Sequence, residues 1–262
     1  MNHWSLPRLS GRWWAVWRRH LRVWSKLAGP AVLGNFGEPL LILLALGYGL
    51  GGFVGEVQGL PYLAFLASGV VCSSTMNTAT FEGLYSAFTR LSSQQTWHAM
   101  LCTPLDVDDI VFGEAMWAAT KGVMSGIAIL IVMTPLGVIH DATALMALPI
   151  LFLTGLCFAS LALVITAFAH SYDFFLYYST LAVTPMFLLS GIFFPLGEMG
   201  PAVQTGAWML PLAHAVALIR PLVVGLPLTE VTLHLLVLAA YTLVGLYFSI
   251  VLLRRRLLGN AD

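Results

Sequence analysis

Hydrophobic residues fall in long runs along the chain, separated by short polar connections. The runs predict six membrane-spanning helices, roughly at residues 34–54, 61–81, 110–134, 142–169, 174–194 and 231–253. Their lengths are near the ~20 residues that a hydrocarbon core requires. The pattern therefore predicts an all-α integral membrane protein with one domain over residues 1–262.

The stretch 195–228, between the last two predicted spans, is apolar but repeatedly interrupted. The interrupting residues are Pro195, Gly197, Gly200, Pro201, Gly206 and Pro211. They cut the stretch into pieces too short to cross a bilayer. Broken backbone at membrane depth is tolerated only where protein or a water-filled cavity satisfies its polar groups. We predict a re-entrant helical hairpin here.

Residues 1–30 form a pattern of two opposed faces at helical period. One face carries Trp13, Trp17, Leu21 and Trp24, and the other carries Arg12, Arg19, Arg22 and Lys26. Such a helix lies along a leaflet, with indoles at headgroup level and cations toward anionic lipid. The alternative is a disordered basic tail.

The second predicted span is unusually polar for membrane depth. Its polar residues are Ser68, Ser73, Ser74, Thr75, Asn77, Thr78 and Thr80. These groups could line a path for a polar headgroup. They could equally serve tight helix packing, because hydroxyls bond the preceding turn of their own helix.

The composition excludes a soluble globule, since 59% of residues are hydrophobic and only 9% are charged. Soluble domains carry about 25% charged residues. Nine of the twelve Lys and Arg residues lie near the two ends of the chain. The positive-inside rule then places both termini in the cytoplasm. Residues 84–109 and the turn at 170–173 are therefore expected on the cytoplasmic side, and the hairpin 195–228 on the outer side.

No pattern for catalysis or metal binding is found in the sequence. Cys72, Cys102 and Cys157 are far apart and form no CxxC pair. Ser190 and His214 could be imagined as a catalytic pair, but the surrounding motif of an intramembrane serine protease is missing. The phosphate-binding GxxxxGK motif is missing too, so we expect no catalytic residue, no metal and no nucleotide site in this chain.

Glu114 and Lys121 are an ionisable pair inside the third predicted span. Ionisable groups within spans are rare and usually face the bundle interior. Seven residues apart, they share a helix face but are too distant for a direct bridge. Either they pair with groups on other helices or Lys121 extends toward the headgroups. A structural or gating role is expected, with substrate contact as the alternative.

Several motifs carry a family resemblance along nearly the whole chain. Pro211, Leu212, His214 and Arg220, in the order P-L-x-H-x5-R, resemble the signature of type-2 ABC (ABC-2) transporter permeases. Within that family, the chain resembles the nodulation protein J permeases for lipo-chitooligosaccharide export. The runs that carry this likeness are AVWRR from Ala15, GEAMWAATKGVMSG from Gly113, FASLALVITAFAHSYDFF from Phe158, PLAHAVALIRP from Pro211 and the tail LLRRRLL.

The resemblance implies a permease subunit in the cell inner membrane. It would move a lipo-oligosaccharide of β-1,4-linked N-acetylglucosamine outward, as two copies of this chain with two ATP-binding subunits that hold ATP and Mg. The alternatives are an ABC-2 permease for a lipid-linked polysaccharide or a drug, and a secondary transporter that does not use ATP. The expected partners are the ATPase, a second copy, membrane lipid and the amphiphilic cargo, and no nucleic acid.

The resemblance also assigns roles to individual residues. A cytosolic ATPase can move membrane helices only through segments that protrude to meet it. Arg90 and Trp97, in a surface helix within 84–109, and His170 and Asp173, in the turn, are the predicted coupling residues. His214 and Arg220 are expected as interfacial anchors of the outer hairpin, with contact to departing cargo as the alternative.

Overall fold

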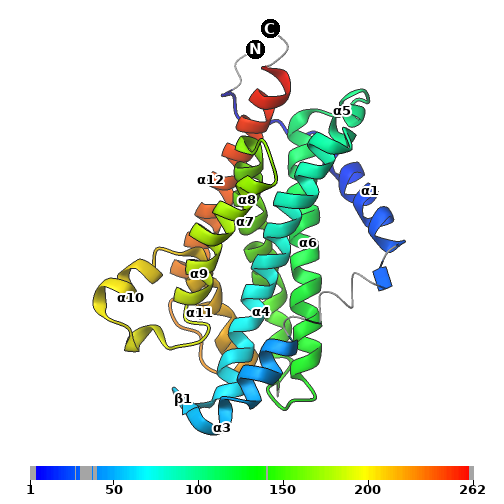
Figure 1. The fold of residues 1–262 in the computed structure, drawn as a ribbon. Helices are drawn as coiled ribbons and strands as arrows, with labels where there is room; N and C mark the ends of the chain where they lie inside the picture. Colours follow the sequence, from blue (N-terminus) through cyan, green and yellow to red (C-terminus); the bar gives the residue numbers. More distant parts are fainter. Residues whose placement is uncertain (1–3, 27, 30–36, 38–39, 140, 260–262) are drawn as a thin grey trace.

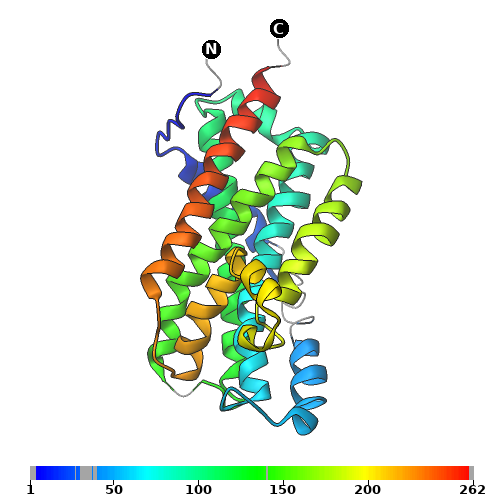
Figure 2. The same ribbon diagram turned by 90° about the vertical axis from the view of Figure 1, so that its left-hand side faces the viewer.

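The computed structural model describes residues 4–26, 28–29, 37, 40–139 and 141–259, and this part of the chain is mostly helical. Figures 1 and 2 show an elongated bundle with the longest helices along its axis. Both described ends of the chain lie at the same end of this bundle, where the Tyr247 hydroxyl donates to the Trp4 carbonyl at 3.2 Å.

The bundle is built from a small number of long helices and several short ones. The long elements are α4 (Tyr62–Phe81), α6 (Val107–Met133), α7 (Ala147–Phe168), which follows η4 (Ala142–Met146), and α12 (Val231–Leu258). A further continuous helix comprises α8 (Asp173–Tyr178), η5 (Ser179–Val183) and α9 (Thr184–Leu189). The short elements are α1 (Trp13–Ser25), η1 (Leu43–Tyr48), α3 (Gly51–Val54), the hairpin of β1 (Glu56–Val57) and β2 (Leu60–Pro61), α5 (Thr96–Leu101), η6 (Leu196–Glu198), α10 (Pro201–Ala207) and α11 (Pro211–Val224).

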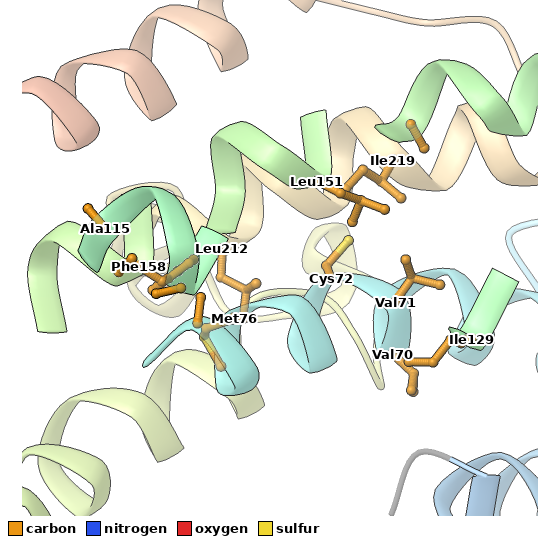
Figure 3. Packing of buried hydrophobic residues seen from close by; sticks show 14 of the residues in the cluster. Val70, Val71, Cys72, Met76, Ala115, Ile129, Leu151, Phe158, Leu212 and Ile219 are labelled. Carbon is orange, nitrogen blue, oxygen red and sulfur yellow. The ribbon is translucent and has the colours of Figure 1, made fainter. Parts of the chain in front are cut away.

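The core lies where α4, α6, α7 and α11 meet, and α12 packs on the other side of α7. Figure 3 shows Cys72 and Met76 of α4 among Leu151, Phe158 and Leu212 from α7 and α11. All five side chains are completely or almost completely buried. In contrast, many large apolar side chains on the bundle surface are exposed, such as Leu181 and Leu243. An apolar exterior around a packed core is expected of a protein solvated by lipid.

Small residues allow the helices to approach closely. A Cβ at Gly155 of α7 would lie 3.1 Å from the backbone of Ala119 in α6, and one at Gly245 of α12 would meet the Ser160 side chain. Close approach through small residues replaces the hydrophobic effect as a source of helix association in lipid.

Three of the six predicted spans are long and apolar enough to cross a membrane, namely Val107–Met133, Ala142–Phe168 and Val231–Leu258. The helices Leu40–Val54 and Asp173–Leu189 are apolar but shorter, and residues 34–36 and 38–39 of the first predicted span lie outside the described residues. Within the described residues, the number of crossing helices is therefore three, or four if one bent pair counts as a span. Six spans stay a prediction.

Residues 84–93 differ from the expected surface helix. After Phe81 the helix continues without a break through η2 (Glu82–Ser86) and η3 (Thr89–Ser93), which widen it into π turns. The two charged residues of this continuation, Glu82 and Arg90, are paired inside the protein, so their polarity does not end the helix. Only the short α5 stands apart, after Gln95 adopts a left-handed conformation with φ 53°.

The stretch 195–228 is interrupted, as its Pro and Gly residues predict. α10 and α11 each begin with Pro and meet at an angle of 86°. Pro suits the first helical position because its missing N–H would have no intrahelical acceptor there. Gly225 ends α11 with φ +77°, a left-handed conformation that favours Gly. Whether the bent pair is re-entrant in a bilayer stays a prediction.

The N-terminal helix α1 uses its aromatic face differently from what was expected. Its described length agrees with the amphipathic pattern, although residues 1–3, 27 and 30 of the predicted segment lie outside the described residues. The Trp17 indole donates to the Thr120 hydroxyl at 3.0 Å, and the Trp13 ring lies 5.3 Å from that of Phe112. The aromatic face therefore packs on α6 rather than facing lipid headgroups alone, because α6 offers it small and hydroxyl-bearing positions.

A substitution at Gly113 tests this docking. A Cβ at Gly113 would lie 2.7 Å from Cβ of Val16 and 2.9 Å from the Trp13 carbonyl oxygen, so Gly113→Leu should push α1 off α6. With Cys102 replaced by Ser, cysteines introduced as Trp17→Cys and Thr120→Cys should be cross-linked in high yield by a short bis-maleimide, which spans the length of the removed indole, and Gly113→Leu should remove most of the cross-linked product. The control is Gly206→Leu, where a Cβ meets open space. An unchanged yield in Gly113→Leu would show that α1 docks elsewhere.

Candidate functional site: a buried charge cluster and a polar groove

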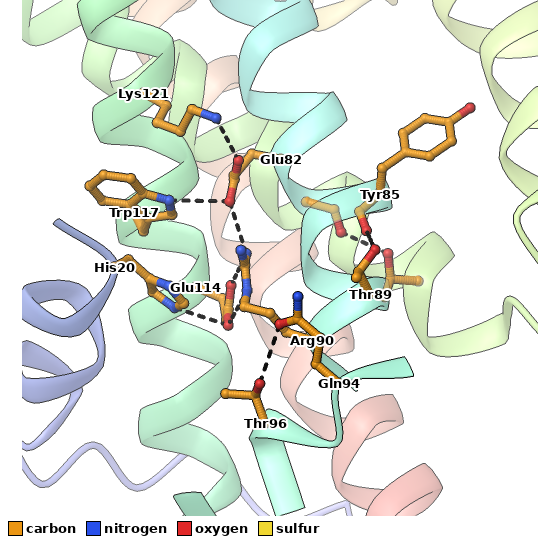
Figure 4. A network of polar contacts seen from close by, with 12 residues as sticks. His20, Glu82, Tyr85, Thr89, Arg90, Gln94, Thr96, Glu114, Trp117 and Lys121 are labelled. Carbon is orange, nitrogen blue, oxygen red and sulfur yellow. Dashed lines mark hydrogen bonds and ion pairs between the residues drawn. The ribbon is translucent and has the colours of Figure 1, made fainter. Parts of the chain in front are cut away.

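Glu114, in the second turn of α6, is the centre of a buried polar cluster (Figure 4). Its side chain is only 1% exposed. Arg90 of η3 donates to it twice, from Nε at 3.0 Å and from Nη2 at 2.5 Å. The Trp97 indole donates to Oε1 at 2.9 Å, and Nε2 of His20 lies 3.0 Å from the same oxygen. Four elements, α1, η3, α5 and α6, therefore meet at one carboxylate.

Glu82 of η2 extends the cluster toward the middle of the bundle. Nη2 of Arg90 donates to it at 2.9 Å, so this guanidinium bridges both carboxylates. Lys121 Nζ donates to Oε2 of Glu82 at 2.7 Å, and the Trp117 indole donates to Oε1 at 3.1 Å. Apart from His20, the cluster contains two carboxylates and two cations, whose charges cancel. Buried charges persist only with such pairing and hydrogen bonding.

The cluster resolves the alternatives for the charged residues of the third span. Lys121 pairs with Glu82 on another helix instead of extending to headgroups, and Glu114 pairs with Arg90. Glu82 and Arg90 are eight residues apart, so they lie on one helix face once the helix is seen to continue past Phe81. That continuation was missed from the sequence, and with it the part played by Glu82.

Arg90 and Trp97 make their polar contacts within this chain, and their coupling to an ATPase stays a prediction. The Trp97 side chain is fully buried and Arg90 is only 13% exposed, so both face the interior of the bundle. Their polar atoms are drawn inward because Glu114 accepts hydrogen bonds from both. Neither side chain is placed to contact another protein directly.

His170 and Asp173, in contrast, lie on an exposed turn between α7 and α8. The turn lies beside the end of η3, because the Tyr172 hydroxyl is 2.8 Å from that of Thr89 and 3.4 Å from that of Ser93. Hydrogen bonds from Ser93 and Thr89 lower the pKa of the Tyr172 phenol. The turn and η3 thus form a joined surface at the end of the bundle that carries both described chain ends (Figure 1).

A second ion pair fastens the chain ends to this same end of the bundle. Arg254 of α12 donates to Asp108 of α6, from Nε at 3.0 Å and from Nη2 at 2.5 Å. The backbone N–H of Arg8 donates to the same carboxylate at 2.7 Å, and that of Ser10 to Asp109 at 3.0 Å. The segment before α1 is therefore held across the start of α6.

The signature residues of the hairpin lie inside the protein, not at an interface. Pro211 begins α11 and Leu212 is part of the core. Arg220 donates to the Ser68 hydroxyl at 3.0 Å and to the Gly191 carbonyl at 2.7 Å, and its guanidinium lies 3.7 Å from the centre of the Phe65 ring. Arg220 thus joins α4, α11 and the loop after α9, which corrects its expected role as a lipid anchor.

His214 is likewise buried, with 4% exposure. Its Nδ1 lies 2.8 Å from Nδ1 of His234 on α12, and its Nε2 lies 2.9 Å from the Trp208 carbonyl oxygen. The residue links α10, α11 and α12, and this internal bonding explains why it does not reach the headgroups.

A polar groove of about 320 Å³ lies between α4 and α6 and is bordered by η1 and α9. Its polar lining comprises Ser73, Ser74, Asn77, Thr78, Glu82, Tyr85, Ser86, Lys121 and Ser125. Its apolar lining comprises Ile42, Val70, Phe81 and Phe187. The groove therefore joins the hydroxyl-rich part of α4 to the Lys121 end of the charge cluster.

Comparisons with known proteins agree on one family. The family model described as "ABC-2 type transporter" matches residues 11–224. The chain is 49% identical to "Nodulation protein J" of Rhizobium leguminosarum bv. viciae, over 97% of this chain and 98% of that protein. It is 46% identical to "Nodulation protein J" of Rhizobium meliloti (strain 1021), over 97% of each chain. "Inner membrane transport permease YadH" of Escherichia coli (strain K12) is 24% identical over 83% of each chain.

The family match and the near full-length relatives identify the chain as a component of a membrane transporter rather than an enzyme. The chain is an integral membrane protein that belongs to the ABC-2 type transporter family and, within it, is similar throughout its length to the nodulation J proteins.

Proposed function

We propose that this chain is the permease subunit of an exporter that moves a lipo-oligosaccharide outward across the cell inner membrane. The cargo is an acylated oligosaccharide of β-1,4-linked N-acetylglucosamine. The observation that carries the proposal is the similarity to nodulation J proteins at 44–49% identity over 97% of the chain. Similarity that covers both ends of the chain favours the same cargo class as well as the same fold.

The energy comes from a separate ATP-binding subunit that carries ATP and Mg, with no cofactor on this chain. The working unit contains two copies of each chain, since symmetric dimers are the commonest closed assembly. Both termini are cytoplasmic, and the ATPase docks on the surface formed by the 170–173 turn and the end of η3. His170 and Asp173 are its proposed contacts because both are exposed there.

The alternative is an ABC-2 permease for a different amphiphile. The permease YadH is similar to this chain at 24% identity, so detectable similarity extends to permeases much less identical than the nodulation J proteins. Identity near 49% with the nodulation J proteins makes the lipo-oligosaccharide the better-supported cargo.

The cargo can be tested in a bacterium that makes a lipo-chitooligosaccharide labelled through radioactive glucosamine. Deleting the gene for this chain should retain the labelled compound inside the cells, and a plasmid copy should restore its release. Equal release with and without the gene would contradict the proposed cargo.

Lys121 offers a test of the charge cluster in transport. Lys121→Met leaves Glu82 with Arg90 and Trp117, so folding should survive. Export should fall by about tenfold, as expected when a hydrogen bond between charged groups worth ~1.4 kcal/mol is lost from a gating step. Lys121→Arg, which keeps the charge, is the matched control. Full export by Lys121→Met would show that the cation has no part in transport.

A further inference from the structure

We propose that the polar groove between α4 and α6 is a binding site for an uncharged sugar ring of a membrane amphiphile. This inference rests on the proposed function and adds to it the place where the cargo's headgroup is recognised. It is carried by three properties of the groove: unpartnered polar groups, a neutral charge balance and exposed aromatic rings.

The first property is a set of polar side chains that have no protein partner. Elsewhere on α4, hydroxyls bond their own helix or a neighbour, as Thr75 does with the Val71 carbonyl and Ser74 with Ser125. In the part of the chain that the structure describes, the side chains of Asn77, Thr78 and Ser86 make no hydrogen bond, although all three line the groove. An amide or hydroxyl withheld from water costs free energy unless it is hydrogen-bonded. These three groups are therefore available to a polar ligand.

The second property is electrical neutrality. Among the described residues that line the groove, the one cation is Lys121, which lies 2.7 Å from Glu82 beside it. A phosphate approaching Lys121 would be repelled by the Glu82 carboxylate, which already pairs with that ammonium group. Neutral donors and acceptors, such as sugar hydroxyls and N-acetyl groups, face no such repulsion. The balance of charge thus favours a carbohydrate over an anionic lipid headgroup.

The third property is the aromatic wall. The rings of Phe81 and Tyr85 are stacked, with centroids 5.3 Å apart, and Phe81 is 53% exposed. Both line the groove together with Phe187. Small-molecule sites are typically apolar walls with a few directed polar groups, and pockets of ~300–1,000 Å³ are the usual size. The groove, at about 320 Å³, meets this description for one sugar ring at a time.

A smaller hollow extends the polar surface toward η5 and α9. It has a volume of about 150 Å³ and shares Asn77 and Phe81 with the groove. Thr80 borders it with a buried hydroxyl that has no partner among the described residues. Unpartnered polar groups therefore line both the groove and this hollow, which suits an oligosaccharide longer than one ring.

The test is direct binding to the full chain in lipid nanodiscs, with tritiated octyl chitotrioside as the probe. The double variant Asn77→Leu/Thr78→Val removes two neutral hydrogen-bonding groups at similar volume, so its Kd should rise by about tenfold. Octyl phosphate should bind weakly to wild type and variant alike. Thr134→Val, which removes a hydroxyl that bonds its own helix at Leu130, is the matched control and should bind the sugar probe as wild type does.

Each result of these binding measurements either supports the proposed sugar site or overturns it. An unchanged Kd in the double variant, or wild-type affinity for octyl chitotrioside no greater than for octyl phosphate, would overturn the site. If the double variant does not fold, Ser86→Ala at the other end of the groove should raise the Kd severalfold, and an unchanged value would overturn the site equally. Retention of labelled cargo by the gene deletion is a separate measurement, so the groove can fail while the proposed function stands.

Discussion

Replacing Glu114 by Leu is expected to cause the largest loss of stability of any single change in this chain. The carboxylate accepts from Arg90 and Trp97 and lies 3.0 Å from His20, and it is 1% exposed. Its removal leaves a buried guanidinium short of a counter-charge, which costs about 3–5 kcal/mol. The thermal midpoint in detergent, followed by size-exclusion chromatography after heating, should fall on the order of 10 °C.

Two further variants locate the cause of that loss. Glu114→Gln keeps an acceptor but not the charge, so its midpoint should lie between those of wild type and Glu114→Leu. Glu198→Leu removes an exposed acid and should leave the midpoint nearly unchanged. If Glu114→Leu had the same thermal midpoint as the wild type, the interactions of Glu114 would not be what holds α1, η3, α5 and α6 together.

The second large effect is expected from Asp108→Ala. The side chain binds the Arg254 guanidinium and accepts from the Arg8 backbone, so its loss frees both the end of α12 and the segment before α1. Losing ~3 kcal/mol at this pair should raise the local opening of the segment by about a hundredfold. Trypsin cleavage after Arg8, followed by mass spectrometry, should accelerate accordingly.

Asp106→Ala is the control for this experiment, because Asp106 is exposed and lies only two residues away. Its cleavage rate should match that of the wild type. Equal rates for Asp108→Ala and Asp106→Ala would mean that the ion pair with Arg254 does not hold the N-terminal segment in place.

The long apolar runs were sufficient to predict α6, α7 and α12, because the length and apolarity of a helix that can cross a bilayer are local properties. The Pro and Gly residues likewise predicted the break at 195–228. The predicted span 174–194 was overestimated in length, because its helix ends at Leu189, whereas the start of the predicted span 34–54 lies partly outside the described residues. Apolar residues beyond a helix end extend a run in the sequence without extending the helix.

The partners of polar residues were harder to predict. The helical period of the hydrophobic residues predicted an aromatic face on α1. It could not predict that Thr120 and Phe112 of α6 cover that face. The sequence predicted that the second span ends at Phe81. Glu82 and Arg90 were therefore not expected on one helix, and the charge cluster was not predicted. His214 and Arg220 were placed at the interface because a cation in an apolar stretch commonly extends there, whereas His234 and the Gly191 carbonyl satisfy them inside. Such pairings depend on tertiary contacts between residues far apart in the sequence, such as Arg220 and Ser68, which are 152 positions apart.

The central claim is that this chain is a permease that does not hydrolyse ATP itself. Its transport is driven by an ATP-binding subunit on the cytoplasmic side. This claim is tested most directly by reconstituting the chain into proteoliposomes, alone and with a candidate ATP-binding subunit, and measuring transport of a radiolabelled acylated chito-oligosaccharide. The account predicts transport only when both chains and hydrolysable ATP are present. Transport by this chain alone, without nucleotide, would contradict it.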